Sequence, residues 1–321
     1  MLMFMMSTGS RTFKESEEIH NSFEYLNELN LYSTPHGDFY PLYEAKLFHQ
    51  YDHRYATFEG KETRYTTVEE KSDWEYVISP RYWISKEEVD NRLGQVALPE
   101  ESSTWERNWL IQFRNISLPT NERTAIFSIV PKTGVGNSSG TLISSNKNAY
   151  ILVSMFNSFI FDYCVRQKIG GMNITFGYIQ QFPVVPPIAF TASLIALITP
   201  RMLELTYTAF DLTGFARDLK YPGDPFTWND ERRFWLRAEL DALYFILYGI
   251  DRDDVDYIMD TFPIVKRKDI ATHGTYRTKD AILAIYDELQ TLGLERFREY
   301  QSRVLTLGLN GGDVAGGWRP E

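Results

Sequence analysis

The pattern of apolar and polar positions divides the chain into a strand-rich first half and a helical second half. Before Pro183 the apolar residues come mostly in short β-branched or aromatic runs, such as NWLIQFRNIS and RTAIFSIVP, which predict strands. One run, AYILVSMFNSFIFDYCV, is longer and has no breaker, so it is compatible with a buried helix. After Pro183 apolar residues recur at helical spacing, most clearly over 230–247, where they fall on one broad face.

Capping and breaking residues set the expected limits of several helices. Residues 13–29 have near-helical spacing and predict a short entry helix. Ser85 stands three residues before Glu88, which indicates a capping box that opens a short helix. Gly249 stands where the helix over 230–247 would end in a left-handed residue. The glycine-rich tail 307–321 is expected to be flexible.

These elements predict an α+β protein in three parts. The parts are a helical entry segment over 1–37, a β-rich domain over 38–187 and a helical C-terminal module with its tail over 188–321. The length of 321 residues fits about two domains, and 43% apolar residues are sufficient for packed cores. Disorder as the default state is therefore excluded.

Charge and cysteine content narrow the class of protein. No apolar run approaches the roughly 18 residues of a membrane span, and the opening MLMFMM lacks the basic flank of a secretory signal. The single cysteine, Cys164, excludes a disulfide framework, so a cytoplasmic protein is expected. A net charge of −10 means that any contact with nucleic acid requires a local basic face or a partner.

Short motifs give only weak indications of chemistry. His49 and His53 have the spacing of two metal ligands on a helix, but Gln50 replaces the glutamate of the metalloprotease pattern and the surroundings favour a strand, so a structural role is expected. The glycine-rich run 134–140 lacks the fingerprint of a phosphate or cofactor loop and is expected to be a plain loop. The fragment 44–46, Glu-Ala-Lys, is the best trace of a metal-dependent nuclease.

Basic residues gather towards the end of the chain, and their role is open. They are Lys266, Arg267, Lys268, Arg277 and Lys279. A solvated loop and a phosphate contact are both compatible with this cluster.

Four longer blocks together resemble one family. They are PLYEAKLFHQYDHRYATF, NERTAIFSIVPKTGVGN, FNSFIFDYCVRQKIGGMNITFGYIQQFPVVPP and LRAELDALYFILYGIDRDDVDYIMDTFPIVKRKD. They look like the C-terminal part of large bacterial adenine-specific DNA methyltransferases, namely type IIG restriction–modification enzymes and related phage-defence methylases of DISARM type. The resemblance covers about 40–289, and 173–187 is also similar in style to the specificity subunits of type I systems.

This resemblance implies a target recognition domain without its catalytic partner. Methylases of this class carry Asn/Asp/Ser-Pro-Pro-Tyr/Phe, whereas Pro186-Pro187 here lies between Val185 and Ile188. No catalytic activity is expected of the chain alone, and S-adenosylmethionine is expected to bind in the missing catalytic domain. A truncation, a split subunit and a gene remnant all remain open.

The resemblance also implies double-stranded DNA and a methyltransferase catalytic domain or subunit as partners, with no membrane. The candidate DNA contacts, chosen by residue type and position in the matching blocks, are Arg114, Asn115, Asn121, Arg123, Arg166, Gln167, Lys168 and Asn173. A protein-interaction module that docks a catalytic subunit without touching DNA is the alternative, and a metal-dependent nuclease is a less favoured one.

Overall fold

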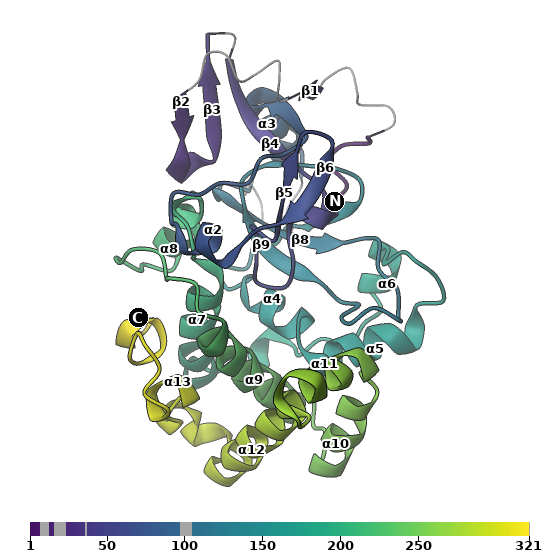
Figure 1. Cartoon of the computed structure of the whole chain (residues 1–321), viewed down its shortest axis with the longest axis vertical. Helices are drawn as coiled ribbons and strands as arrows, with labels where there is room; N and C mark the ends of the chain where they lie inside the picture. The colour runs from purple at the N-terminus through teal and green to yellow at the C-terminus, as the bar shows by residue number, and fades with distance from the viewer. Residues whose placement is uncertain (7–12, 16–23, 36, 97–104, 321) are drawn as a thin grey trace. The chain divides into compact units, whose positions relative to one another are not determined.

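The computed structural model describes residues 1–6, 13–15, 24–35, 37–96 and 105–320 (Figure 1). It is an α+β protein, as the sequence predicts, with antiparallel strands mostly in the N-terminal part and helices in the C-terminal part. The chain forms two compact units. Within the described residues no helix is long and apolar enough to cross a membrane.

Each unit is assembled from three separate stretches of the chain. Unit 1 comprises Met1–Ile116, Ile126–Val153 and Thr206–Trp228, and unit 2 comprises Ser117–Ala125, Ser154–Leu205 and Asn229–Glu321. The predicted boundary after residue 187 does not coincide with this division. The chain returns to unit 1 after it has entered unit 2. Local sequence patterns do not reveal such long-range packing.

The described residues of unit 1 form three sheets. The largest has the order β1-β7-β4-β3-β2, formed by Phe13–Glu15, Tyr82–Ser85, Gly37–Tyr43, Leu31–Thr34 and Glu24–Leu26, and β10 (Gly134–Val135) pairs in parallel with β4. The second has the order β11-β8-β9, formed by Ser139–Leu142, Trp109–Arg114 and Phe127–Pro131. A hairpin of β5 (Ala56–Glu59) and β6 (Glu62–Tyr65) is the third.

Two short helices in unit 1 begin at capping residues. Ser85 accepts from the backbone N–H of Glu88 and opens α3 (Lys86–Gly94), which confirms the side-chain cap of the predicted capping box but not its reciprocal bond. A reciprocal capping box, which the sequence analysis did not single out, joins Thr67 and Glu70 at the start of α2 (Val68–Ser72).

The predicted N-terminal entry helix is wrong where its residues are described. Residues 13–15 and 24–26 are strands, and Asn27–Leu29 is a single turn of 3-10 helix. Phe13 pairs with Ile84 of β7 in the largest sheet. Pairing with a distant strand, which near-helical spacing cannot reveal, therefore decides the conformation here.

The helices of unit 2 surround a core between α9 (Asp230–Leu247) and α12 (Arg277–Leu292). Leu240 and Leu243 of α9 and Ile282 and Ile285 of α12 are almost completely buried. The predicted glycine C-cap of α9 is confirmed, since Gly249 has a φ of 68°. The remaining helices are α5 (Phe159–Lys168), α6 (Phe176–Ile179), α7 (Ala192–Thr206), α10 (Arg252–Asp260), α11 (Pro263–His273) and α13 (Arg303–Thr306).

The long apolar run before Pro183 is helical, as its length indicated. It forms α4 (Ile151–Phe156) and α5, and the two helices are separated by Asn157 and Ser158. Ser158 accepts from the backbone N–H of Phe161 and so caps α5.

The glycine-rich tail is ordered, in contrast to the flexible end that the sequence predicts, because its backbone hydrogen-bonds to Arg232 and Glu204. Arg232 forms a buried pair with Glu204 at 2.7 Å and donates to the carbonyls of Gly312 and Asp313 at 3.0 and 3.2 Å. Glu204 also accepts from the backbone N–H of Ala315 at 2.8 Å. The tail satisfies the hydrogen-bonding groups of a buried ion pair, which orders it in this structure.

Candidate nucleic-acid interface

The eight predicted DNA contacts divide between the two units. Arg114 and Asn115 lie at the end of β8 in unit 1, and the other six belong to unit 2. Four of those six are exposed, and two are engaged in bonds within the unit.

Arg114 and Asn115 hold parts of unit 1 together. The Arg114 guanidinium donates through Nε to the carbonyl of Phe48 at 3.0 Å and lies 5.5 Å from the centre of the Tyr55 ring. Burial lowers the pKa of Arg114 from its ordinary value. Asn115 donates through Nδ2 to the carbonyl of Asn137 at 3.0 Å. Both side chains therefore brace neighbouring loops in this structure.

A fully buried carboxylate, Asp162, organises the matching part of unit 2. It accepts from Arg123 Nε at 2.8 Å and from Arg166 Nε at 3.2 Å. The backbone N–H groups of Thr124 and Ala125 also point to it, at 3.1 and 3.3 Å. Asp162 therefore ties the loop 117–125 to α5 through one side chain, Arg123, and two backbone groups, while Arg166 binds it from the same helix.

The two arginines also contact groups other than Asp162. Arg166 donates through Nη2 to the carbonyls of Asn121 and Glu122 at 2.8 and 2.9 Å. Its guanidinium lies 4.1 Å from the ring centre of Phe262, immediately before α11, and that of Arg123 lies 3.9 Å from Phe159. Burial lowers the pKa of Arg166, and the neighbouring Asp162 opposes this effect. These contacts bring the loop, α5 and α11 together.

The side chains that remain available on this part of unit 2 are mostly amides. Asn121, Gln167, Lys168 and Asn173 are all exposed. Among the residues that the structure describes, Lys168 has no ion-pair partner. Ser117 donates its backbone N–H to the carbonyl of Met172 at 2.9 Å, so the segment carrying Asn173 is fixed to the loop carrying Asn121.

The predicted basic cluster near the end of the chain is divided by the fold. Lys266 pairs with Asp260 at 2.9 Å, Lys279 with Asp256 at 2.6 Å, and Arg277 with Glu231. Lys268 binds Glu122 of the loop, and Arg267 beside it is exposed. Of these five basic residues, Lys268 in the middle of α11 is the one that contacts the loop 117–125.

We call the segments 117–125, 162–175 and 262–273 the basic surface. Together they contain six arginines and lysines against three carboxylates, so their net charge is +3 in a chain whose total is −10. Two residues that assemble this surface, Asp162 and Phe262, were not predicted from the sequence. A single aspartate inside the apolar run of α5 was the available signal, because a carboxylate in such a helix requires buried partners.

His49 and His53 lie in a tight turn of unit 1, not in the strand that was expected. His49 and Asp52 exchange backbone hydrogen bonds at 2.8 and 3.0 Å across it. His53 is buried, and its Nε2 lies 2.9 Å from Oδ1 of Asp211. Within the described ranges no group of three or more potential metal ligands occurs.

The glycines of 134–140 are explained by close packing in strands, not by a plain loop. A Cβ on Gly134 would lie 2.4 Å from Ile84, and a Cβ on Gly140 would lie 2.2 Å from the ring of Phe113. Gly140 faces Phe113 of the paired strand β8, and Gly134 faces Ile84 of β7 in the same sheet. This geometry does not fit a cradle for phosphate or S-adenosylmethionine.

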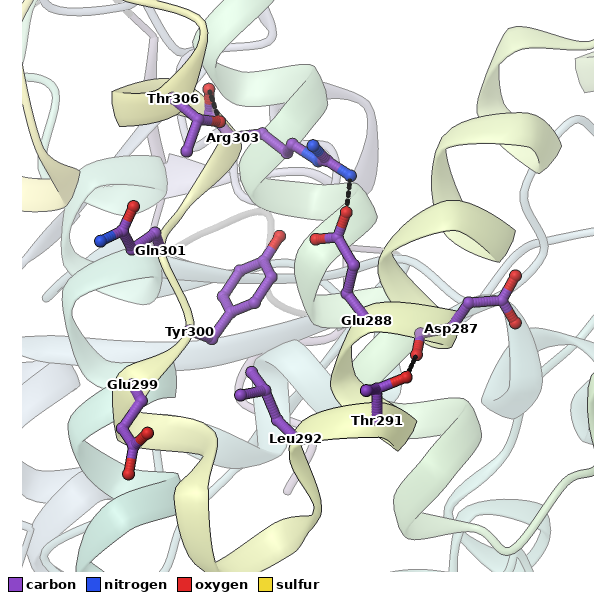
Figure 2. Close-up of a pocket in the computed structure, with 9 residues that line it drawn as sticks. All are labelled: Asp287, Glu288, Thr291, Leu292, Glu299, Tyr300, Gln301, Arg303 and Thr306. Atoms are coloured by element: carbon purple, nitrogen blue, oxygen red, sulfur yellow. Dashed lines mark hydrogen bonds and ion pairs between the residues drawn. The ribbon is translucent and has the colours of Figure 1, made fainter.

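An open groove of about 530 Å³ lies between α12 and the segment 299–306 (Figure 2). Its carboxylates already hold arginines: Asp287 pairs with Arg252, Glu288 with Arg303 and Glu299 with Arg296. The Tyr300 ring forms one wall, and burial raises the pKa of its hydroxyl. No uncompensated charge among these lining residues marks the groove for a ligand.

No family model, curated protein or solved structure matches the chain.

Proposed function

We propose that the basic surface of unit 2 binds double-stranded DNA, and that the chain is the sequence-recognition part of a bacterial restriction–modification or phage-defence system that methylates adenine at N6. The observation that carries this proposal is the local charge of +3 on segments that also expose three amide side chains. Phosphates attract local positive charge, and the adenine edge is matched by amides, which both donate and accept. The four sequence blocks described above supply the methyltransferase context.

Two kinds of contact are assigned to the exposed side chains. Asn121, Gln167 and Asn173 are assigned to base edges, because an amide forms two hydrogen bonds with the major-groove edge of adenine. Lys168 and Arg267 are assigned to phosphates, where their charge adds affinity for any sequence.

Arg123 and Arg166 are assigned a supporting role. Their guanidinium groups bind Asp162, so a direct bond to a base would first require the loss of a buried ion pair. In their present position they fix the loop 117–125 before DNA arrives. A preformed loop loses less conformational entropy on binding, which favours affinity.

A methyltransferase catalytic domain or subunit is the proposed protein partner. It would bind S-adenosylmethionine and hold the extruded adenine, since this chain contains no Asn/Asp/Ser-Pro-Pro-Tyr/Phe sequence. The surface described here is small and the whole chain is acidic, so DNA binding by the chain alone is expected to be weak and to fall steeply with salt.

Selection from a pool of random duplexes at low salt tests the proposal. The full chain is expected to enrich one short sequence motif over successive rounds. The variant Lys168→Ala should retain the same motif with lower yield, because a phosphate contact adds affinity without choosing sequence. Enrichment of no motif by the wild-type chain, alone or with a methyltransferase subunit, would contradict the proposal.

A second candidate is a protein-docking module. It is favoured by Ile188, whose side chain is 93% exposed, and by Val184, which is 48% exposed in the same connecting segment. Burying these side chains against a partner protein would be favourable. If Ile188→Asp abolishes binding to a methyltransferase subunit while the chain selects no DNA motif, the docking role replaces DNA recognition.

A further inference from the structure

Two large apolar side chains are exposed within the basic surface. Leu118 is 38% exposed and Met172 is 56% exposed. Both lie close in sequence to amides that are also exposed, Asn121 and Asn173. Burying these two side chains against a bound molecule would be favourable.

The backbone holds both residues in place. The carbonyl of Met172 accepts from Ser117 N–H at 2.9 Å, next to Leu118 in the chain. The carbonyl of Leu118 accepts from Asn121 N–H at 3.0 Å and from Thr124 Oγ1 at 3.0 Å. The two apolar side chains are thus presented by adjoining segments of fixed conformation.

The base of this loop is supported by buried charge. Thr124, one residue after Arg123, donates its backbone N–H to Asp162. Asp162 is fully buried and binds Arg123 and Arg166 as well. A loop anchored in this way is preorganised, so it loses little conformational entropy when it binds another molecule.

We propose that Leu118 and Met172 form an apolar wedge that enters a base step of the bound duplex and unstacks it. The inference rests on the proposed function. DNA is favoured over a protein as the occupant because amides and basic side chains accompany the two apolar residues, and these suit base edges and phosphates. Proteins that insert leucine, isoleucine or methionine between base pairs bend the duplex and widen their contact with it. Unstacking also lowers the cost of extruding a neighbouring adenine.

The experiment uses the duplex selected by the chain, with 2-aminopurine placed at each position in turn. This base analogue fluoresces more strongly when it is unstacked. Wild-type protein is expected to raise the fluorescence several-fold at one step, and Leu118→Ala/Met172→Ala should abolish the rise. Ile188→Ala is the matched control, because it truncates an exposed apolar residue outside the basic surface.

A second measurement compares the selected duplex with a copy that carries a mismatch at the responsive step. The double variant is expected to bind the paired duplex about tenfold more weakly and the mismatched duplex with nearly wild-type affinity, since the mismatch has already lowered the cost of unstacking. Normal fluorescence changes in the double variant, or equal losses on both duplexes, would overturn the wedge and leave DNA recognition intact. If no duplex binds the wild-type chain, both proposals fail.

Discussion

The guanidinium of Arg123 donates through Nε to the fully buried carboxylate of Asp162 across 2.8 Å. This bond joins the loop 117–125 to α5 inside unit 2. A carboxylate with no exposed surface must keep its partners, because an unpaired buried charge is strongly unfavourable. The loop on which the proposed DNA contacts depend is therefore part of the stable structure of the unit.

Arg123→Ala is expected to lower the free energy of unfolding by about 2 to 4 kcal/mol, because it removes one partner of a buried ion pair. Arg252→Ala is the matched control. Arg252 also donates through Nε to an aspartate, Asp287, at 2.7 Å, but the two side chains are 51% and 47% exposed. The control should cost much less, because water screens an exposed ion pair. Urea unfolding measures both, and equal losses would contradict the bracing role.

Asp241 is expected to make stability depend on pH in the acid range. Burial raises the pKa of Asp241 from 3.8 to about 6, although its carboxylate accepts from the backbone N–H of Phe159 at 2.8 Å. The folded state thus binds a proton that the unfolded state releases between about pH 4 and pH 6. Stability from this group is present below that range and is lost as pH rises through it.

Asp241→Asn should remove this dependence while keeping an acceptor for Phe159. The variant is expected to be more stable than wild type at pH 7 by about 2 kcal/mol, with little difference near pH 4. Urea midpoints across the acid range measure the effect, and Asp280→Asn, an exposed residue of α12, controls for the change in charge. A variant that loses stability at neutral pH would show that the charged form is favoured by the fold.

His53 is expected to stabilise unit 1 without a metal. His53→Ala removes a buried ring and leaves Asp211 without its 2.9 Å partner, so a loss of about 2 to 4 kcal/mol is expected. His49→Ala should cost less, because His49 is only half-buried. A chelator should leave the melting temperature of wild type unchanged. A fall in Tm on chelation that both variants abolish would instead establish a metal site.

Gly140, in the glycine-rich run 134–140, is expected to be sensitive to side-chain size, and Gly170, outside the run, gives the comparison. Gly140→Ala places a Cβ 2.2 Å from Phe113 and should cost about 1 to 3 kcal/mol through overpacking. Gly170→Ala meets nothing within 4 Å, so its effect on thermal unfolding should be small. Full stability of Gly140→Ala would contradict the packing explanation.

Local features of the fold could be predicted from the sequence. Ser85 caps a helix because its hydroxyl needs only the N–H of Glu88, three residues away. Gly249 ends α9 because a positive φ favours a residue without a side chain. Both depend on neighbours in the chain, and a sequence pattern records them directly.

Features that depend on distant residues could not be predicted. Phe13 pairs with Ile84, and the chain enters and leaves unit 2 more than once. The same limit applies to the candidate site: the sequence indicates Arg123 and Arg166 as polar contacts, yet both bind Asp162. Residue type alone does not distinguish a guanidinium that reads a base from one that supports a loop.

The central claim is that the basic surface contacts DNA. Fluorescence anisotropy tests this claim most directly. Binding is measured on the selected duplex and on a scrambled one, at two salt concentrations and with a methyltransferase subunit present. Lys168→Ala should weaken binding to both duplexes and reduce the salt slope by about 1. Asn121→Ala should cost about 1 to 3 kcal/mol on the selected duplex only. Lys61→Ala, which removes an exposed lysine of unit 1, should change neither. If Lys168→Ala and Asn121→Ala both bind the two duplexes as wild type does, the basic surface is not the DNA contact.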